Sequence, residues 1–403
     1  MVDMQTVTDD FHAAAGKSSF IRKMFEKGIE LKKLYGEDAV CDFSLGNPDV
    51  PPPEAARAVL HRIADEAVKP LGLGYCPNAG IPACREAIAA HLAQQQGLPL
   101  AGKDVVITVG AASALVCFFR ATLDPGDEII VPSPYFVEYG NYCGHFGGVL
   151  KPVPTHEDFT LDIPAIASAI TPKTRAILIN SPNNPTGTIY TRAELEELAS
   201  LVERTNAARG EGERPLFILS DEPYRAFAYD GAEVPPVLPM TKFAVVLGSF
   251  SKTLSMAGER IGYIVVSPEL TKLDGGALMS TLILVNRTLV YVNAPVIGQR
   301  LAAAICNETV DLAIYKRRRD LMAKVLKDAG IEFIMPRGAF YFFPKAPGGD
   351  DAKFVDALLA ERILAVPGSG FGRKGHIRLS CSVDEKIIAR SAEGFKRATE
   401  ACK

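Results

Sequence analysis

Short, continuously apolar runs recur through the middle of the chain and constrain its fold more than any other feature. They cover residues 105–109, 128–131, 176–180, 216–219, 243–247 and 261–266. Strands that are apolar throughout, rather than at every second position, are typical of a sheet covered on both faces. Helical patterns and turn residues separate several of these runs, as in strand–helix–strand units. The sequence therefore predicts an α/β fold around a mostly parallel sheet.

The two ends of the chain have a different pattern. Before the first run, apolar spacing predicts helices over residues 22–33, 54–68 and 82–96. After about Leu312 the composition changes, and a charged helix over 315–329 leads into further elements. These are strands at 333–335, 339–343, 363–366 and 376–379, and a closing helix at 385–401. The C-terminal part therefore predicts a smaller α+β domain.

Composition and charge exclude several classes of protein. The net charge of −3 over 403 residues does not favour nucleic acid or an anionic membrane as a partner. The eight cysteines are scattered without metal-ligand spacing, which predicts no metal site and a reducing compartment. The first ten residues are acidic and polar, unlike a signal peptide, and no apolar run is long enough for a membrane helix. We expect a cytoplasmic protein that binds neither membrane nor nucleic acid.

A lysine follows the apolar run 243–247. The sequence there reads Gly-Ser-Phe-Ser-Lys-Thr over residues 248–253, so Lys252 lies just past a strand end, and Arg260 follows eight residues later. One interpretation is a surface loop with two solvated cations. The more specific interpretation is a Schiff-base lysine. An amine in a partly desolvated pocket loses its proton more easily and can condense with an aldehyde cofactor. The neighbouring hydroxyls and Arg260 would then hold the cofactor's phosphate.

Polar or small residues also follow two other runs. Gly110, Ala111 and Ala112 stand where the run 105–109 turns into a helix, so backbone N–H groups can approach an anion at the helix N-terminus. A plain tight turn is the alternative. Asn184 lies between prolines after the run 176–180 and can donate its amide to a ligand oxygen. The alternative there is an Asn/Pro/Gly turn without a ligand.

Asp221 and Tyr224 follow the run 216–219. An aspartate at a strand end can pair with a positively charged ring nitrogen, and Tyr224 can hydrogen-bond a phenolic oxygen. Phe136, after the run 128–131, can stack on a flat ring. The alternatives are an N-cap aspartate and two core aromatic residues. Arg378 interrupts the strand at 376–379, where it can clamp a carboxylate with two hydrogen bonds or lie on the solvated side of an edge strand.

The combination is more specific than any of its members. Four strand ends carry, in chain order, a phosphate turn, Asn, Asp and Lys, and open parallel sheets bind ligands at the carboxyl ends of their strands. This set resembles the fold type I pyridoxal-phosphate enzymes, specifically the class I/II aminotransferases of the aspartate aminotransferase superfamily. The resemblance extends from Gly46-Asn47-Pro48-Asp49 to Arg378. It implies a large cofactor-binding domain at 56–311 with a seven-stranded sheet, and a small domain made of 1–55 and 312–403.

The resemblance also implies how pyridoxal 5'-phosphate is held. Lys252 is expected to form the imine with the cofactor and to shuttle the proton, while Asp221 pairs with the pyridine nitrogen. Asn184 and Tyr224 are expected to contact the phenolic oxygen, and Phe136 takes the ring-stacking place, which is often Trp in the family. The phosphate is expected to be held by Ser249, Ser251, Arg260 and the backbone amides of Ala111 and Ala112.

The substrate and the second subunit are implied in the same way. Arg378 is expected to bind the substrate α-carboxylate, with Gly46 and Asn184 nearby. Tyr75 corresponds to a tyrosine that reaches the phosphate of the neighbouring subunit, which implies a homodimer with shared active sites. Bacterial aspartate-preferring members often have a lysine where Ala112 stands. Arg287 is near the position that reads a second carboxylate, although Thr288 could occupy it instead, so dicarboxylate specificity stays open.

The leading functional hypothesis is transamination between an α-amino acid and a 2-oxo acid. The acceptor expected from the family is 2-oxoglutarate, and the donor is aspartate, alanine or an aromatic amino acid. A β-eliminating carbon–sulfur lyase on the same fold is the alternative enzyme. A regulatory module with an aminotransferase-like half is the alternative of another class. It would need a basic DNA-binding domain ahead of Gly46, where this sequence has only about forty residues. A nicotinamide dehydrogenase is disfavoured, because the glycines over 368–372 have the wrong spacing.

Overall fold

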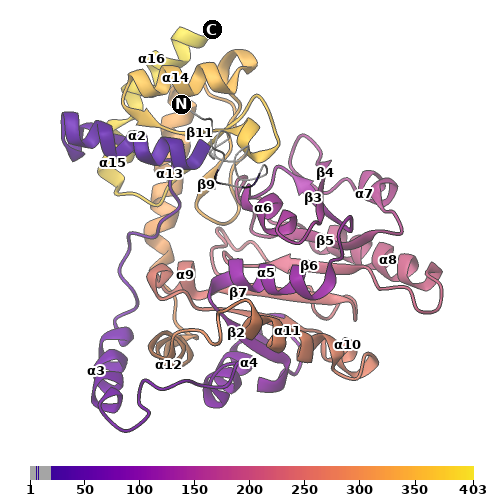
Figure 1. Cartoon of the computed structure of the whole chain (residues 1–403). Helices are drawn as coiled ribbons and strands as arrows, with labels where there is room; N and C mark the ends of the chain where they lie inside the picture. Colours follow the sequence, from indigo (N-terminus) through magenta and orange to yellow (C-terminus); the bar gives the residue numbers. More distant parts are fainter. Residues whose placement is uncertain (1–5, 7, 9–19) are drawn as a thin grey trace. The chain divides into compact units, whose positions relative to one another are not determined.

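The computed structural model describes residues 6, 8 and 20–403, which form two compact units (Figure 1). The smaller unit comprises Met1–Gly46, Arg318–Ile334 and Phe342–Lys403, and the larger comprises Asn47–Arg317 and Met335–Tyr341. The sequence predicted domain boundaries at 55/56 and 311/312, and much of residues 1–19 in the predicted N-terminal segment lies outside the described residues. The units instead divide at 46/47 and 317/318, and residues 335–341 belong to the larger one.

A seven-stranded sheet forms the centre of the larger unit, in the order β2-β8-β7-β6-β5-β3-β4. Only β8 runs antiparallel to its neighbours β2 and β7, so the predicted mostly parallel sheet is confirmed. The strands are β2 (Val105–Thr108), β3 (Glu128–Ser133), β4 (Val149–Pro154), β5 (Thr174–Asn180), β6 (Phe217–Asp221), β7 (Ala244–Ser249) and β8 (Gly262–Val266). All six predicted runs are strands, whereas β4 was not predicted. Its sequence, Val-Leu-Lys-Pro-Val-Pro, is not continuously apolar, and it lies partly exposed at the sheet edge.

Helices precede, connect and follow these strands along the chain. They are α3 (Ala55–Ala67), α4 (Pro82–Gln96), α5 (Gly110–Thr122), α6 (Glu138–Gly144), α7 (Ile163–Ala169), α8 (Arg192–Ala208), α9 (Phe250–Thr253), α10 (Pro268–Leu273), α11 (Ala277–Thr288) and α12 (Val296–Ile305). The predicted capping box of α8 is present. The Thr191 hydroxyl accepts from the backbone N–H of Glu194, and the backbone N–H of Thr191 donates to Oε2 of Glu194 at 2.7 Å. These bonds satisfy donors that the first helical turn leaves unpaired.

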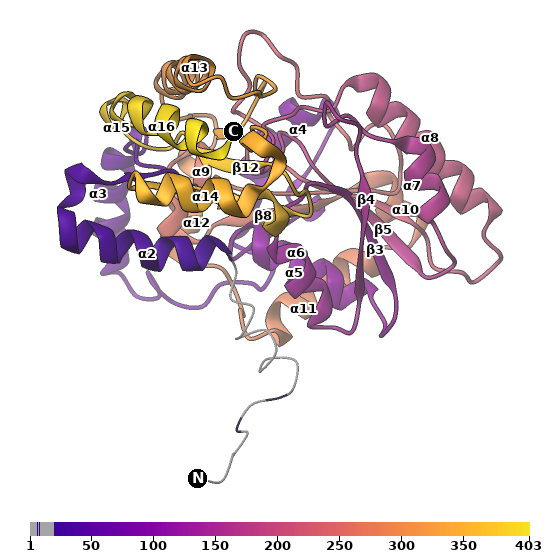
Figure 2. The ribbon, with the colours of Figure 1, turned by 90° about the horizontal axis from the view of Figure 1, so that it is seen from above.

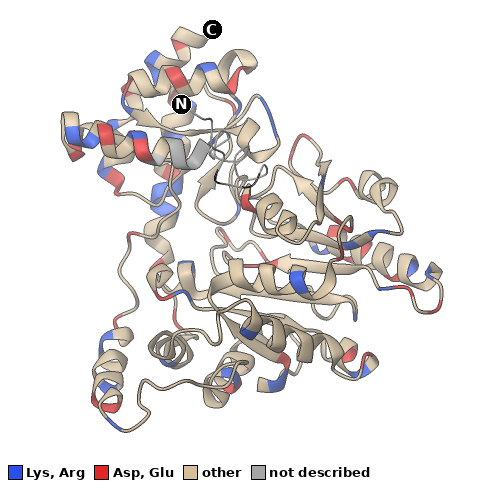
Figure 3. Cartoon of the chain, viewed as in Figure 1, with Lys and Arg blue, Asp and Glu red and all other residues tan. Residues whose placement is uncertain are grey.

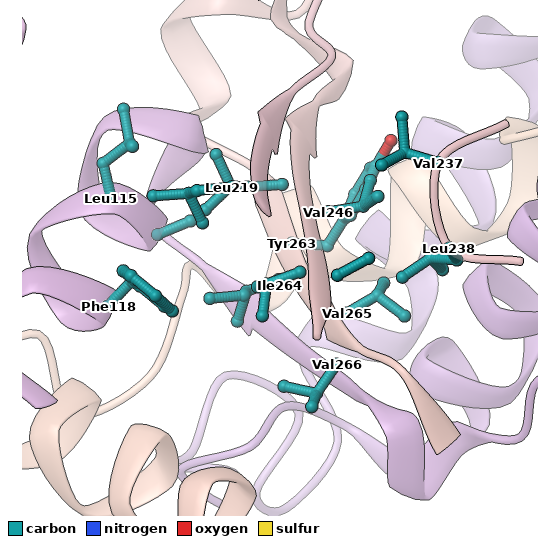
Figure 4. Packing of buried hydrophobic residues seen from close by; sticks show 14 of the residues in the cluster. Leu115, Phe118, Leu219, Val237, Leu238, Val246, Tyr263, Ile264, Val265 and Val266 are labelled. Atoms are coloured by element: carbon teal, nitrogen blue, oxygen red, sulfur yellow. The ribbon is translucent and has the colours of Figure 1, made fainter. Parts of the chain in front are cut away.

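The core of the larger unit explains why its strands are apolar on both faces. Figure 4 shows Ile264 of β8 on the same side as Leu115 and Phe118 of α5, whereas Val265 points to the opposite face, toward Leu238. Successive side chains of a strand point to opposite faces, so a sheet with packed layers on both sides needs apolar residues throughout. Every residue of β2, β5, β6, β7 and β8 is buried.

The smaller unit is an α+β assembly. Strand β1 (Cys41–Asp42) pairs in parallel with β10 (Ile363–Leu364), and a second sheet has the order β11-β12-β9. These strands are β11 (Val366–Pro367), β12 (Ile377–Ser380) and β9 (Tyr341–Phe342), and the chain passes between the units within β9. The helices are α2 (Phe20–Tyr35), α14 (Asp351–Ala360), α15 (Glu385–Arg390) and α16 (Ala392–Cys402). Figure 2 shows α14 beside α16, which it contacts.

Three predicted elements near the C-terminus were wrong in detail. Residues 333–335 form no strand, and the single closing helix is broken into α15 and α16 at Ser391. Helix α13 (Leu312–Asp328) begins three residues before its predicted start and crosses from one unit to the other after Arg317. Five short 3-10 helices complete the described elements, at Glu37–Ala39, Gly102–Asp104, Ala257–Glu259, Pro347–Gly349 and Gly368–Phe371.

Charged residues of both signs mix along the helices of each unit (Figure 3). This distribution agrees with the small net charge of −3. Within the described part of the chain, no helix combines the length and the apolar character that crossing a membrane requires.

Candidate active site

The sheet topology gathers most of the predicted residues at one edge of the larger unit. Strands β2, β3, β5, β6 and β7 end there, because they run in the same direction. Strand β8 begins at this edge, because it runs the opposite way. Gly262 pairs with Thr108 of β2 on one side and with Ser249 of β7 on the other, so the segments around these three residues lie one strand spacing apart. Ligand sites of open α/β sheets form at this kind of edge.

Lys252 lies at this edge, in the short helix α9 that follows β7 directly. Its side chain is half-buried, and its Nζ is 5.9 Å from the centroid of the Phe340 ring. Ser249, the last residue of β7, and Ser251 are both buried. The prediction of a lysine past a strand end is therefore confirmed as a placement. A half-buried amine beside an aromatic ring is less hydrated than one on a solvated loop.

A helix N-terminus and a cation meet beside Lys252. Helix α5 begins at Gly110, so Ala111 and Ala112 lie in its first turn. A Cβ on Gly110 would lie 2.7 Å from Nη2 of Arg260, so the guanidinium is close to the start of the helix. Arg260 is itself exposed, and its Nη1 donates to the carbonyl oxygen of Ala257 at 2.9 Å. The first-turn N–H groups and this cation together favour an anion.

Asp221, the last residue of β6, is almost fully buried with 5% of its surface exposed. Its Oδ2 accepts a hydrogen bond of 2.6 Å from the hydroxyl of Tyr139 in α6. Its Oδ1 is buried and has no hydrogen-bond partner among the described residues. Burial raises the pKa of Asp221 to about 7, while the Tyr139 bond lowers this pKa and the charge of Glu222 raises it. A buried carboxylate oxygen without a donor is costly, and a ligand N–H would satisfy it.

Two side chains at this edge, those of Tyr139 and Asn180, were not predicted from the sequence. Tyr139 lies three residues after Phe136, which is one helical turn away, and their rings meet edge to face at 5.5 Å. Asn180 ends β5 opposite Asp221. Its Nδ2 donates to the backbone oxygen of Asp221 at 2.8 Å, and its Oδ1 accepts from the backbone N–H of Asn184 at 2.7 Å. Asn180 therefore joins the ends of two strands and orients the loop that carries Asn184, which is buried.

Tyr224 is buried one turn beyond the end of β6. Its hydroxyl lies 2.9 Å from the hydroxyl of Tyr341, and its ring meets that of Phe340 edge to face at 5.3 Å. Phe136, by contrast, is only half-buried after β3. A ring that is not enclosed by the core has a free face on which a flat ligand could stack.

Tyr75 lies on the surface, with 93% of its side chain exposed. It contributes to the lining of a cavity of about 530 Å³, together with Leu73, Glu259, Tyr291 and Asn293. The preceding loop also exposes apolar side chains, including Leu71 at 89%. Arg287 is exposed near the C-terminus of α11, as is Thr288, so the structure does not choose between them as a reader of a second carboxylate.

Gly46 and Arg378 belong to the smaller unit. Arg378 lies in β12 and is buried with 2% exposure, so the alternative of a solvated edge arginine is wrong. Its Nη2 donates to the backbone oxygen of Ser44 at 2.5 Å, and its guanidinium carbon lies 4.7 Å from the centroid of the Phe371 ring. These contacts hold the planar group in one orientation. Gly46 is half-buried at the end of this unit's first segment.

Known proteins resemble this chain over almost all of its length. The family model of the class I and II aminotransferases matches residues 38–395. The aspartate/prephenate aminotransferase of Thermus thermophilus is 33% identical over 378 residues, which cover 92% of this chain and 93% of the relative. Aromatic-amino-acid aminotransferase 2 of Thermococcus litoralis is 32% identical, covering 87% of this chain and 90% of the relative.

A solved structure has the same fold. The crystal structure of an amino transferase from Eubacterium rectale superposes with a TM-score of 0.93 at 35% identity, covering 99% of this chain and 100% of that one. The predicted fold type I architecture is thereby confirmed. The names of these relatives refer to transamination, and none of them favours the β-eliminating alternative.

Proposed function

Since the chain belongs to the class I and II aminotransferases, we propose that the strand-end site of its larger unit holds pyridoxal 5'-phosphate. The chain is a transaminase, which moves an amino group between an α-amino acid and a 2-oxo acid. When bound, the cofactor supplies an aldehyde carbon that condenses with amines and a protonated ring that accepts electrons. The observation that carries the proposal is the buried Oδ1 of Asp221, which has no donor among the described residues and lies at the edge where Lys252 lies.

The ring of the cofactor is proposed to lie among side chains from three strand ends. Asp221 accepts the ring N–H at Oδ1, and this pairing of opposite charges keeps the carboxylate ionised. Asn184 and Tyr224 donate to the phenolic oxygen, and Phe136 stacks on the ring. The Oδ1 of Asp221, which has no hydrogen-bond partner among the described residues, supports this assignment. Asn184 and Tyr224 follow the ends of the neighbouring strands β5 and β6.

The phosphate is proposed to lie at the N-terminus of α5. The backbone amides of Ala111 and Ala112, the hydroxyls of Ser249 and Ser251, and Arg260 provide donors of the kind that phosphate requires. Two observations support this phosphate position. Gly262 pairs with both β2 and β7, and Arg260 lies close to Gly110. Ala112 supplies only its backbone here, since its side chain is a methyl group.

Lys252 is proposed to bond the cofactor's aldehyde carbon through Nζ and, once released by the substrate, to move the substrate's α-proton. The support for this role is the position of Lys252 directly after β7, where its side chain is half-buried beside Phe340. Tyr224 orients the phenolic oxygen and is the third residue to which we assign a catalytic role, beside Lys252 and Asp221.

The active unit is proposed to be a homodimer with shared sites. Tyr75 is 93% exposed, and the exposed apolar side chains Val68, Leu71 and Leu73 precede it in sequence. Val290, exposed by 84%, lies two residues before Val292 in the lining of the Tyr75 cavity. Burial of these side chains against a second copy of the chain would remove their apolar surface from water. Tyr75 would then reach the phosphate of the partner subunit.

Arg378 is proposed to bind the substrate's α-carboxylate, and Gly46 and Asn184 are proposed to contribute to substrate binding. The relatives named above act on aspartate and prephenate or on aromatic amino acids, and 2-oxoglutarate is the acceptor that we propose. A screen of the twenty amino acids against 2-oxoglutarate and pyruvate tests this. We expect amino transfer that requires added cofactor and is fastest with aspartate or an aromatic donor. Release of ammonia without transfer to either acceptor would refute the proposal.

A further inference from the structure

A segment distant in sequence is anchored to two of the strand-end loops. The backbone N–H groups of Arg337 and Gly338 both donate to the carbonyl oxygen of Gly187, which ends the loop that carries Asn184. Gly338 also forms a bridge with Ala228, and the Ala339 N–H donates to the Phe227 oxygen at 2.9 Å. The segment 337–341 is therefore held by backbone bonds to the loops after β5 and β6, which are both part of the proposed site.

Two glycines permit this approach. A Cβ on Gly187 would lie 2.5 Å from Cβ of Pro336, and one on Gly338 would lie 2.6 Å from the carbonyl oxygen of Phe227. Real Cβ atoms do not come this close to other atoms, so any side chain at either position would push the segment away. The hydroxyl of Tyr229 adds another anchor by donating to the Ala339 oxygen at 2.6 Å. Residues 339–341 are thus held to the loops after β5 and β6 by hydrogen bonds and by close backbone packing.

The anchored segment presents two aromatic side chains to the proposed catalytic residues. Phe340 faces Lys252 at 5.9 Å and meets Tyr224 edge to face at 5.3 Å. Tyr341 also meets the Tyr224 ring edge to face, at 5.6 Å, and its hydroxyl lies 2.9 Å from the Tyr224 hydroxyl. Both tyrosines are buried. A buried hydroxyl pair at this distance shares one proton as donor and acceptor.

We propose that Tyr341 is a positioning residue for Tyr224, and that its hydroxyl sets how strongly Tyr224 donates to the phenolic oxygen of the cofactor. The inference rests on the proposed function. When Tyr341 donates, the Tyr224 oxygen accepts, and the single Tyr224 proton is directed away from Tyr341. The accepted bond also polarises the Tyr224 hydroxyl, which makes it a stronger donor.

This arrangement has a consequence at Lys252. A stronger donor at the phenolic oxygen stabilises negative charge there, so the nitrogen that joins Lys252 to the cofactor binds its proton less tightly. Loss of the Tyr341 hydroxyl therefore raises the pH at which that nitrogen loses its proton. The titratable groups assigned to the same site, namely Asp221 in β6, Tyr139 in α6 and Lys252 in α9, are unchanged when Tyr341 is changed to Phe.

The test is a pH titration of the visible absorbance of the protein loaded with pyridoxal 5'-phosphate. Tyr341→Phe keeps the ring and its packing and removes only the hydroxyl. We expect the absorbance midpoint to rise by about half a pH unit in Tyr341→Phe and by about one unit in Tyr224→Phe, as hydrogen bonds to charged groups would give. The double variant should match Tyr224→Phe, because Tyr341 acts through Tyr224.

Tyr229→Phe is the matched control, since it removes a buried hydroxyl that anchors the same segment through the backbone oxygen of Ala339. It should lower the thermal unfolding midpoint and leave the absorbance midpoint unchanged. An unmoved midpoint in Tyr341→Phe, equal shifts in Tyr341→Phe and Tyr229→Phe, or additive shifts in the double variant would each overturn the role of Tyr341. The proposed function requires a visible band in the wild type that is lost in Lys252→Ala. If the wild type shows no such band, both the proposed function and the role of Tyr341 are overturned.

Discussion

The hydroxyl of Tyr139 donates a 2.6 Å hydrogen bond to Oδ2 of Asp221, while Oδ1 of the same carboxylate is buried without a partner in the described part of the chain. One oxygen is thus held by Tyr139, and the other is left without a donor among the described residues. Such an arrangement orients a carboxylate for a ligand, because the bond to Tyr139 prevents the side chain from rotating to satisfy itself.

This relationship predicts a pH-dependent stability of the cofactor-free protein. Burial raises the pKa of Asp221 from 3.8 to about 7, so the folded state holds a proton that the unfolded state releases between these values. The Asp221 contribution to the free energy of unfolding is therefore present below pH 4 and falls as the pH rises to 7, by at most about 4 kcal/mol. Urea unfolding of the wild type and of Asp221→Asn at several pH values measures it.

We expect the difference in unfolding free energy between wild type and Asp221→Asn to shrink or change sign as the pH rises. Tyr139→Phe, which loses the bond that favours the carboxylate, should extend the fall to higher pH. Saturation with cofactor should reduce the fall in stability with rising pH, since an opposite charge at Oδ1 keeps the carboxylate ionised. Parallel curves for wild type and Asp221→Asn would contradict a raised pKa at this position.

Shared active sites can be tested by complementation. Lys252→Ala and Tyr75→Ala are each expected to be nearly inactive, provided that Tyr75 supports the partner's phosphate. After unfolding and refolding together, hybrids contain one site with both residues intact, so about a quarter of the wild-type activity should return. Each variant refolded alone is the control and should regain nothing. A mixture no more active than its components would show that Tyr75 does not act across subunits.

Arg378→Lys should weaken every substrate to a similar degree. A buried, desolvated carboxylate pair costs on the order of 2–5 kcal/mol to break, and the lysine point charge cannot reproduce the two parallel bonds of guanidinium. We expect kcat/KM to fall roughly tenfold to a thousandfold for all amino donors, because all present the same α-carboxylate. A loss confined to dicarboxylic substrates would assign Arg378 to the side chain of the substrate instead.

Arg287→Ala separates two possibilities that its exposed position leaves open. If Arg287 reads a second carboxylate in the neighbouring site, the variant should lose activity with aspartate and glutamate and keep it with alanine. The ratio of the two effects is the measurement, and Thr288→Ala tests the alternative residue at the adjacent position in the same way. A ratio near one would remove Arg287 from substrate recognition.

Much of the larger unit could be predicted because its strands carry a local signal. Each continuous apolar run became a strand, and the polar residues directly after the runs gathered at one edge, as with Asp221 at the end of β6. The edge strand β4 could not be predicted, because its pattern lacks that signal. The antiparallel direction of β8, which brings Arg260 to the same edge, depends on pairing between distant segments. The residues of β8 alone do not indicate it.

The parts of the site that were missed depend on contacts over long sequence distances. Tyr341 is 117 residues from Tyr224, and the sequence placed it in a strand of the C-terminal domain rather than beside the loop after β6. Tyr139 had a weak local signal, since it lies one helical turn after Phe136. Asn180 ends an apolar run, yet its role depends on the facing strand end, where it bonds the backbone of Asp221.

The central claim is that Lys252 is the amine that bonds the cofactor, and reduction with borohydride tests it most directly. The protein incubated with pyridoxal 5'-phosphate is reduced, digested and mapped by mass spectrometry, with Lys252→Ala treated in parallel. We expect one peptide, containing residues 248–253, to carry the reduced cofactor on Lys252, and Lys252→Ala to lose activity by orders of magnitude. Stoichiometric labelling of another lysine, with Lys252 unmodified, would contradict the account.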